Sequence, residues 1–316
     1  MKKEDIRIVF MGTPEFAVTI LEGLLKEKYQ VVGVITAPDR PAGRGQKIHL
    51  SAVKVFAKSK DLTVLQPTNL KDETFLSDLK NLNANLQIVV AFRMLPEVVW
   101  KMPKLGTFNL HASLLPDYRG AAPINWAIIN GEKTSGVTTF FIDEKIDTGA
   151  IILQSKIAIN PSDTAGNLHD KLMVLGTKVV INTIEKIENG TVETIIQPLK
   201  ETKTAYKLNK DNCKIVWTSS LESIYNMVRG LHPYPASWAL LQNGSERLNV
   251  KVYEVKKHYE KHEYLTGELI LTKKSIKVAV NMGYIELINF KFPGKRQMDA
   301  TSFLNGFTFE ENSKML

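Results

Sequence analysis

The apolar run QIVVAF, residues 87–92, decides the fold class. Five consecutive positions, 88–92, carry apolar side chains with no polar residue between them. A strand of an antiparallel sheet that has one solvent-exposed face alternates apolar and polar residues. A strand of a parallel sheet is buried on both faces and is apolar throughout. The run therefore predicts a central strand of a parallel sheet that lies between two layers of helices.

Outward from this run, short strand-like segments alternate with helical patterns over the first two thirds of the chain. Strands are expected at 6–10, 31–36, 63–66, 87–92, 107–111, 136–142 and 150–157. Helices are expected at 15–25, 49–60, 72–80, 96–101, 121–130 and 164–188. This alternation predicts a doubly wound α/β domain with a mostly parallel, Rossmann-like sheet.

The last third of the chain has a different pattern. One amphipathic helix is expected near 220–230, and five strand-like runs follow it: ASWALLQ (236–242), RLNVKVYEV (247–255), GELILT (267–272), SIKVAV (275–280) and YIELINFKF (284–292). Several short strands separated by turns indicate a small β-barrel of the oligonucleotide-binding-fold type. We therefore expect a catalytic domain at 1–189, a linker at 190–206 and a C-terminal barrel domain at 207–316.

Composition narrows the class of protein. The chain has 316 residues, of which 44% are hydrophobic and 23% charged, so we expect globular domains rather than disorder. No apolar run approaches the roughly 18 residues of a membrane span, and the start of the chain lacks a signal-peptide pattern. A single cysteine, Cys213, can neither form an intrachain disulfide nor supply a multi-thiolate metal site. We expect a cytoplasmic protein with no membrane association and no bound metal.

Two polar side chains stand at the end of the strand expected at 107–111. Asn109 and His111 are two positions apart, so they share one face of that strand. An amide and a protonated imidazole both donate hydrogen bonds, as acyl transfer requires where negative charge grows on a carbonyl oxygen. Asp147 follows the next strand, and its carboxylate would orient and charge the imidazole if the two meet. Spacing alone is more often explained by satisfied polar strand ends and a turn-forming aspartate.

The surrounding motifs resemble a known family. They are NLH (109–111), SLLP (113–116), YRGAAP (118–123) and IDTG (146–149). In this order and spacing they resemble the signature of formyltransferases that use 10-formyltetrahydrofolate. The likeness continues in FMGTPEFA (10–17), TAPDRPAGRGQK (36–47), NPSDTAGNLHDKL (160–172), LHPYPASW (231–238) and PGKRQM (293–298). It therefore spans nearly the whole chain.

The resemblance implies roles for particular residues. Asn109 and His111 would stabilise the oxyanion, and Asp147 would position and charge His111. Folate contacts are implied for Phe92, Arg93, Met94, Leu95, Ser113, Leu114, Leu115, Pro116, Ile142, Asp143 and Asp147. The segment AFRMLP (91–96) departs from many relatives, which have an aromatic residue, a glycine and one further residue before Leu-Pro.

Other segments of the chain indicate which molecule accepts the formyl group. The net charge is +8, and the loop PDRPAGRGQK (38–47) carries three cations on a backbone rich in glycine and proline, which suits phosphate groups. The resemblance implies that this loop enters the acceptor end of a tRNA, so that the reaction formylates the α-amino group of initiator methionyl-tRNA. Contacts with tRNA are expected for Arg40, Arg44, Lys47, Lys207, Lys210, Lys295 and Arg296.

Two other functions stay open at this stage. A sugar-nucleotide formyltransferase would use the same folate chemistry on a small amine, although the cationic loop argues against it. A catalytically silent RNA-binding protein would bind tRNA without turnover, although the complete Asn109, His111 and Asp147 set argues against that. We expect the protein to act as a monomer.

Overall fold

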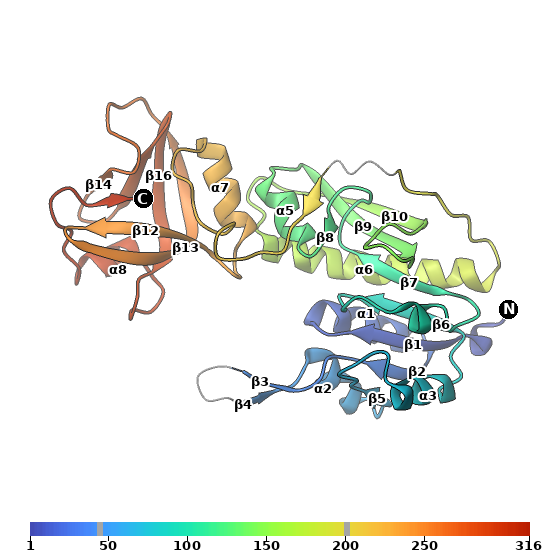
Figure 1. Ribbon diagram of the computed structural model, residues 1–316. Helices are drawn as coiled ribbons and strands as arrows, with labels where there is room; N and C mark the ends of the chain where they lie inside the picture. Colours follow the sequence, from blue (N-terminus) through green and yellow to red (C-terminus); the bar gives the residue numbers. More distant parts are fainter. Residues whose placement is uncertain (43–46, 199–202) are drawn as a thin grey trace. The chain divides into compact units, whose positions relative to one another are not determined.

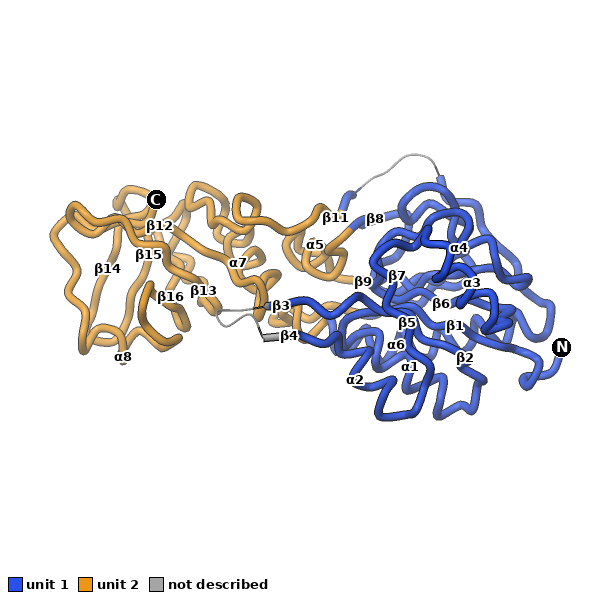
Figure 2. The backbone as a smooth tube through the Cα atoms, turned by 60° about the horizontal axis from the view of Figure 1, so that its bottom comes forward, with its two compact units in different colours: residues 1–120, 135–157, 169–204 blue, residues 121–134, 158–168, 205–316 orange. Residues whose placement is uncertain are grey.

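The computed structural model describes residues 1–42, 47–198 and 203–316 (Figure 1). These residues form two compact units, which Figure 2 shows in different colours. Unit 1 consists of residues 1–120, 135–157 and 169–204, and unit 2 of residues 121–134, 158–168 and 205–316. Two short segments of the N-terminal two thirds thus belong to unit 2. The continuous domains 1–189 and 207–316, with a linker at 190–206, stay a prediction.

Unit 1 is built on a seven-stranded sheet in the order β10-β9-β7-β6-β1-β2-β5. Its strands are β1 (Arg7–Gly12), β2 (Gln30–Ile35), β5 (Val64–Leu65), β6 (Leu86–Val90), β7 (Thr107–His111), β9 (Thr134–Phe141) and β10 (Ile151–Ala158). Strands β5, β2, β1, β6 and β7 are parallel neighbours, and β9 pairs antiparallel with β7. Every residue of the central strand β6 is buried. The mostly parallel α/β sheet is therefore confirmed.

Helices cover both faces of this sheet. They are α1 (Glu15–Lys26), α2 (Ala52–Ser59), α3 (Glu73–Asn81), α4 (Glu97–Trp100) and the long α6 (Ala165–Glu188), which runs beside β7 and β9 in Figure 1. On one face, Val9 and Val89 of the sheet pack in one apolar cluster with Phe75 of α3. On the other face, a Cβ on Gly176 of α6 would lie 2.8 Å from Leu110 of β7. The absence of that atom lets the helix lie close against the strand.

The structure places a short hairpin where the sequence predicted a loop. β3 (Arg40–Ala42) pairs antiparallel with β4 (Lys47–His49), with Pro41 opposite Ile48. The glycines and prolines of this segment predicted a turn. The three-residue strands that flank it are too short to show a period in the sequence.

Unit 2 contains a nearly closed antiparallel barrel. Its strands are β12 (Ser237–Asn243), β13 (Glu246–Tyr259), β14 (Leu269–Leu271), β15 (Ile276–Val280), β16 (Gly283–Lys291), β17 (Met298–Asp299) and β18 (Lys314–Met315). They follow the order β14-β15-β16-β13-β12-β18, and β17 pairs with β16. The N–H of Met315 donates to the carbonyl oxygen of Gly267, 2.8 Å away, so the last strand returns to the segment that leads into β14. The predicted barrel is confirmed.

Helices complete unit 2. α5 (Pro123–Ile129) and α7 (Leu221–Gly230) belong to it, and α8 (Ala300–Leu304) packs on the barrel, where Phe303 joins the core with Phe290. The helix α8 and the two-residue strands β17 and β18 have no counterpart in the sequence prediction. In the described parts of both units, no helix is long and apolar enough to cross a membrane.

Candidate active site

The candidate site lies at the carboxyl end of β7, where open parallel sheets bind ligands. Asn109 pairs with Val89 of β6 on one side and with Phe140 of β9 on the other, and His111 pairs with Thr138. The period of two therefore places the side chains of Asn109 and His111 on the same face, two residues apart. The strand ends at His111, so the imidazole lies at the carboxyl end of β7, next to the loops that follow the strands.

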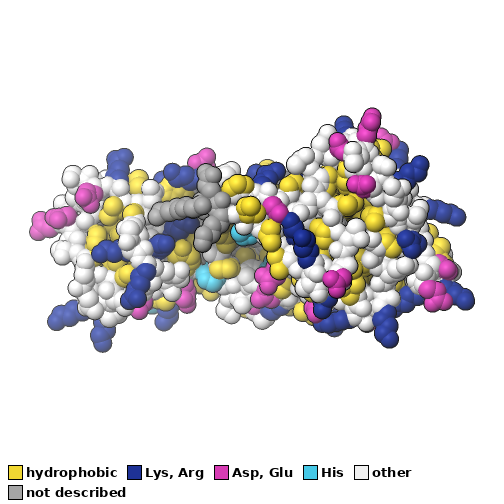
Figure 3. Space-filling view, turned by 90° about the horizontal axis from the view of Figure 1, so that it is seen from below, with side chains coloured by type: hydrophobic (Ala, Val, Ile, Leu, Met, Phe, Trp, Pro, Cys, Tyr) yellow, Lys and Arg dark blue, Asp and Glu magenta, His cyan; other side chains and the backbone are white. Residues whose placement is uncertain are grey.

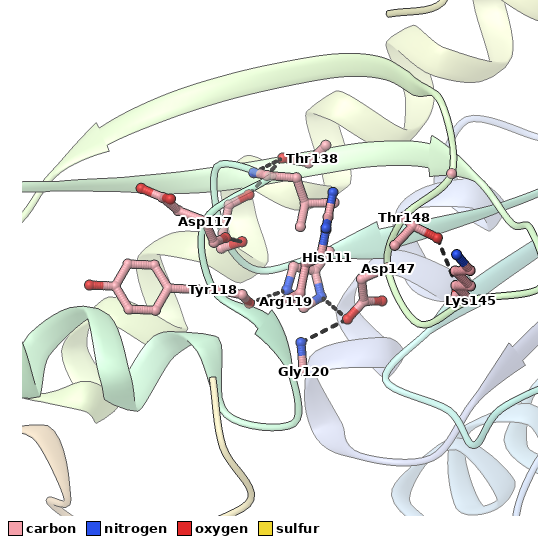
Figure 4. Close-up of polar contacts among 12 residues, drawn as sticks. His111, Asp117, Tyr118, Arg119, Gly120, Thr138, Lys145, Asp147 and Thr148 are labelled. Atoms are coloured by element: carbon pink, nitrogen blue, oxygen red, sulfur yellow. Dashed lines mark hydrogen bonds and ion pairs between the residues drawn. The ribbon is translucent and has the colours of Figure 1, made fainter. Parts of the chain in front are cut away.

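His111 is buried, and each nitrogen of its ring faces an oxygen atom. Nε2 donates to the backbone carbonyl oxygen of Tyr118, 2.8 Å away. Nδ1 lies 3.7 Å from Oδ2 of Asp147, and Figure 4 shows the two side chains pointing toward each other. A neutral imidazole has only one N–H group, whereas an imidazolium has two. The carbonyl of Tyr118 therefore takes the one N–H group of a neutral ring, and only an imidazolium would present a second N–H group toward Asp147.

Asp147 is held by the loop between β9 and β10. Its backbone φ is 56°, in the left-handed region, which residues other than glycine seldom occupy. Its Oδ2 atom also accepts a hydrogen bond of 2.9 Å from the N–H of Gly120 (Figure 4). Within the same loop, the hydroxyl of Thr148 donates to both carboxylate oxygens of Asp143, at 2.7 and 2.9 Å. Asp147 is thus fixed from its backbone and from its side chain.

Asn109 differs from its two neighbours in the site. It is half-buried, and its amide makes no hydrogen bond with the described residues. Its NH₂ group has two donors that are free to meet a ligand. An amide donor, an imidazole and a carboxylate thus come together at one strand end, and this set can stabilise a developing oxyanion and hold a nearby positive charge.

The residues expected to bind folate fall into two groups. Arg93, Met94 and Leu95 line an open hollow of about 880 Å³, together with residues 68–71, 96–98 and 101. Met94 and Arg93 are exposed, while Leu95 is buried and packs in the sheet core. Phe92 is half-buried and packs against the same core.

Arg93 is tied to the loop after β5. Its guanidinium donates to the carbonyl oxygens of Pro67 and Thr68. Desolvation by neighbouring groups and then the positive charge of Arg40 lower the pKa of Arg93, although its side chain is exposed overall.

The second group directly follows the strands β7 and β9. Ser113 is buried, and its hydroxyl donates to the carbonyl oxygen of Asp117 at 2.7 Å. Leu115 precedes a cis peptide bond to Pro116, and its N–H donates to the Thr138 hydroxyl. Leu114, Ile142 and Asp143 are half-buried around these loops. Ser113 and Leu115 are buried, so the accessible side-chain surface of this group comes from Leu114, Pro116, Ile142 and Asp143.

The residues expected to contact tRNA occur in both units. Arg40 is exposed on β3, and Lys47 begins β4, whereas Arg44 lies outside the described residues. In unit 2, four exposed residues belong to this set: Lys207, Lys210, Lys295 and Arg296. On the face drawn in Figure 3, Lys and Arg side chains are spread among uncharged ones rather than gathered in one patch.

The base of the β3–β4 hairpin is anchored by Asp39. One carboxylate oxygen accepts from Gln66 at 2.9 Å, and the other accepts from the buried Lys54 in a short contact. The hydrogen bonds from Gln66 and Lys54 lower the pKa of Asp39. The residue before Arg40 is therefore an ionised carboxylate that is exposed to solvent but held by two neighbouring side chains.

Two backbone groups of this site had no place in the sequence analysis. The carbonyl of Tyr118 and the N–H of Gly120 bind His111 and Asp147, and both belong to the motif YRG. The signal for them is Gly120, whose φ of 118° only glycine adopts easily.

In the described ranges 1–42, 47–198 and 203–316, no group of three or more His, Cys, Asp or Glu residues is arranged to hold a metal ion.

Comparison with known proteins defines the class. Residues 6–184 match the formyl transferase family, and residues 207–308 match the formyl transferase C-terminal domain. The chain therefore belongs to the formyl transferase family, as its motifs indicated. A methionyl-tRNA formyltransferase of Flavobacterium johnsoniae is 63% identical, over 99% of each chain. A methionyl-tRNA formyltransferase of Bacteroides thetaiotaomicron is 50% identical, over 100% of each chain.

Solved structures share the fold at much lower identity. The sugar 3N-formyl transferase WlaRD, solved with dTDP and 5-N-formyl-THF, has a TM-score of 0.64 at 21% identity, over 92% of this chain and 99% of its own. HypX from Aquifex aeolicus in complex with tetrahydrofolic acid has a TM-score of 0.63 at 16% identity, over 94% of this chain and 46% of its own. These likenesses concern the fold alone.

Proposed function

We propose that this chain transfers the formyl group of 10-formyltetrahydrofolate to the α-amino group of initiator methionyl-tRNA, giving N-formylmethionyl-tRNA for the start of translation. The observation that carries this proposal is its identity of 50–63% over nearly the full length to methionyl-tRNA formyltransferases. The sugar formyltransferase is a distant structural neighbour at 21% identity, so the sugar-nucleotide alternative has weaker support.

In the proposed reaction, the amine nitrogen attacks the formyl carbon, and the carbonyl electrons move onto its oxygen. The tetrahedral intermediate then collapses as the bond to the folate nitrogen breaks, that nitrogen gains a proton, and the amine loses one. A free α-amino group has a pKa of about 7.7 to 8.0, and the electron-withdrawing ester of an aminoacyl-tRNA lowers this pKa, so that much of the amine is neutral near pH 7. The main barrier therefore lies in the oxyanion and the leaving group.

The geometry of the site leaves hydrogen-bond donors that can stabilise this oxyanion. The free NH₂ group of Asn109 can donate to the oxyanion, because it has no partner among the described residues. Nε2 of His111 is occupied by the Tyr118 carbonyl, so Nδ1 is the nitrogen left for the substrate. Its distance of 3.7 Å to Asp147 exceeds that of a hydrogen bond, which leaves the Nδ1–H group free to donate while the carboxylate balances the charge.

The substrates would approach from different segments. The folate-derived formyl donor is expected to contact the loops at 92–95, 113–116 and 142–143, as in the sequence analysis. The tRNA is expected to contact the hairpin through Arg40, Arg44 and Lys47, and unit 2 through its basic side chains. We further propose that the protein acts as a monomer in the cytoplasm, without a metal.

Formylation can be tested directly. Purified protein is incubated with 10-formyltetrahydrofolate and either charged initiator tRNA or an amino-sugar nucleotide, and each product is identified by mass spectrometry. Formyl-methionine on the tRNA alone is the expected result. A formylated sugar with unchanged tRNA would overturn the proposal, and tRNA binding without either product would identify a silent RNA-binding protein.

A further inference from the structure

One buried amide connects the loop of Asp147 to the motif that holds His111. Gln197 is 5% exposed and follows Ile195, which forms a β-bridge with Ile151. Its Nε2 atom donates to the carbonyl oxygens of Asp147 and Gly149, at 3.0 and 2.7 Å. Both N–H groups of the amide are thus spent on the backbone around Asp147.

The oxygen of the same amide faces a buried cation. Nε and Nη2 of Arg119 donate to Oε1 of Gln197, at 3.2 and 2.7 Å, and Nη2 also lies 3.3 Å from the Pro198 carbonyl oxygen. Arg119 is 5% exposed, so these charge-assisted bonds are shielded from water. A guanidinium therefore fixes which end of the Gln197 amide faces the Asp147 loop.

These contacts close a ring around the candidate catalytic pair. Arg119 stands between Tyr118, whose carbonyl accepts from His111, and Gly120, whose N–H donates to Asp147. Gln197 then ties Arg119 to the backbone of Asp147 itself. Gln197 thus links the segment that holds His111 to the loop that holds Asp147.

We propose that Gln197 is a positioning residue for Asp147, held in orientation by Arg119, in the formyl transfer reaction. This inference rests on the proposed function. Asp147 has a φ of 56°, a conformation that persists only where surrounding contacts impose it. The two hydrogen bonds from Gln197 supply that constraint at the carbonyl groups of Asp147 and Gly149, and so keep the carboxylate beside His111.

A substitution of equal size separates the two ends of the amide. Gln197→Glu keeps an oxygen for Arg119, but it replaces the NH₂ group with a second oxygen that faces the two carbonyls. Gln197→Met removes both polar ends at similar length and introduces no charge. Gln87→Glu is the matched control, because Gln87 is also buried in unit 1 but its oxygen accepts from Thr107 at 3.1 Å, away from the Asp147 loop.

The measurements are single-turnover formylation and equilibrium binding of both substrates, each made on protein shown to be folded by circular dichroism. We expect both Gln197 variants to transfer the formyl group about 10- to 100-fold more slowly, as small displacements of catalytic groups commonly cause. Dissociation constants for tRNA and folate should stay within about twofold of the parent values. Gln87→Glu should retain the parental rate.

A double substitution tests whether Gln197 acts through Asp147. In an Asp147→Asn background, Gln197→Glu should cost less than about twofold, because coupled residues are not additive. Equal losses in both backgrounds, or a parental rate in both Gln197 variants, would overturn the inference. If Asp147→Asn itself left transfer at the parental rate, the proposed catalytic role of Asp147 would fail instead, so the two failures are distinguishable.

Discussion

Nδ1 of His111 and Oδ2 of Asp147 lie 3.7 Å apart, joined through the backbone of residues 118–120 rather than by a direct hydrogen bond. This separation is short enough for a charge interaction and too long for a hydrogen bond. The pair can therefore hold positive charge on the ring and still leave one donor for a substrate oxygen.

Asn109→Ala should slow single-turnover formyl transfer by about 10²- to 10³-fold, since one oxyanion donor contributes about 2.7–4 kcal/mol. The melting temperature should change little, because the amide has no partner among the described residues. Rapid-quench kinetics and thermal unfolding check the two statements. A rate within about threefold of the parent would contradict the donor role.

Asp147→Asn should slow transfer by about 10²-fold, because it preserves shape but removes the negative charge beside the imidazolium. Single-turnover kinetics on folded protein measure this effect. A rate equal to that of the parent would exclude the pairing.

Asp39→Asn should weaken the use of tRNA without altering the use of folate, because Asp39 anchors the hairpin that carries Arg40. The KM for charged tRNA should rise while the KM for the formyl donor stays constant. Equal changes in both constants would indicate general damage rather than a loosened hairpin.

The lowered pKa of Asp39 also predicts how stability depends on pH. A carboxyl whose pKa is lowered by folding stabilises the folded state above its unfolded value, about 3.9, and that stabilisation is lost as pH falls through the lower folded value. The free energies of unfolding of the parent and Asp39→Asn should therefore differ at neutral pH and converge below that range. Denaturant titrations at several pH values measure the difference.

Binding of tRNA should weaken steeply with salt, because contacts with several phosphates release counterions. Lys295→Gln combined with Arg296→Gln should reduce the slope of log K against log salt by about 1 to 2. Lys273→Gln, an exposed lysine outside the predicted set, serves as the control. A salt slope unchanged by the double substitution would remove these two residues from the interface.

Gly149→Ala should destabilise the protein and abolish most of the activity. A Cβ at this position would lie 1.6 Å from the backbone oxygen of Phe141, so the loop of Asp147 must shift. Overpacking of this kind typically costs about 1–3 kcal/mol. Chemical denaturation gives the loss of stability, and the rate measured on folded protein shows whether Asp147 has moved. An unchanged rate would mean that the loop tolerates the shift.

The sequence alone determined the architecture, because burial restricts which positions of a strand or helix carry apolar side chains. The strand expected at 107–111 coincides with β7, and the apolar run at 87–92 contains the buried strand β6, since side chains buried on both faces must be apolar. The motifs likewise identified the family before any coordinates. They also predicted that Asn109, His111 and Asp147 form one site, because the proposed chemistry restricts the residue types that can perform it.

Only the tertiary structure decided how these side chains meet. The carbonyl of Tyr118, the N–H of Gly120 and the amide of Gln197 act through loops in which Tyr118 and Asp147 have φ values of 63° and 56°. Such conformations leave no period, because contacts between distant segments impose them. Residue type and spacing therefore specify the layers of the fold, whereas the distances between reacting groups arise from how the loops pack together.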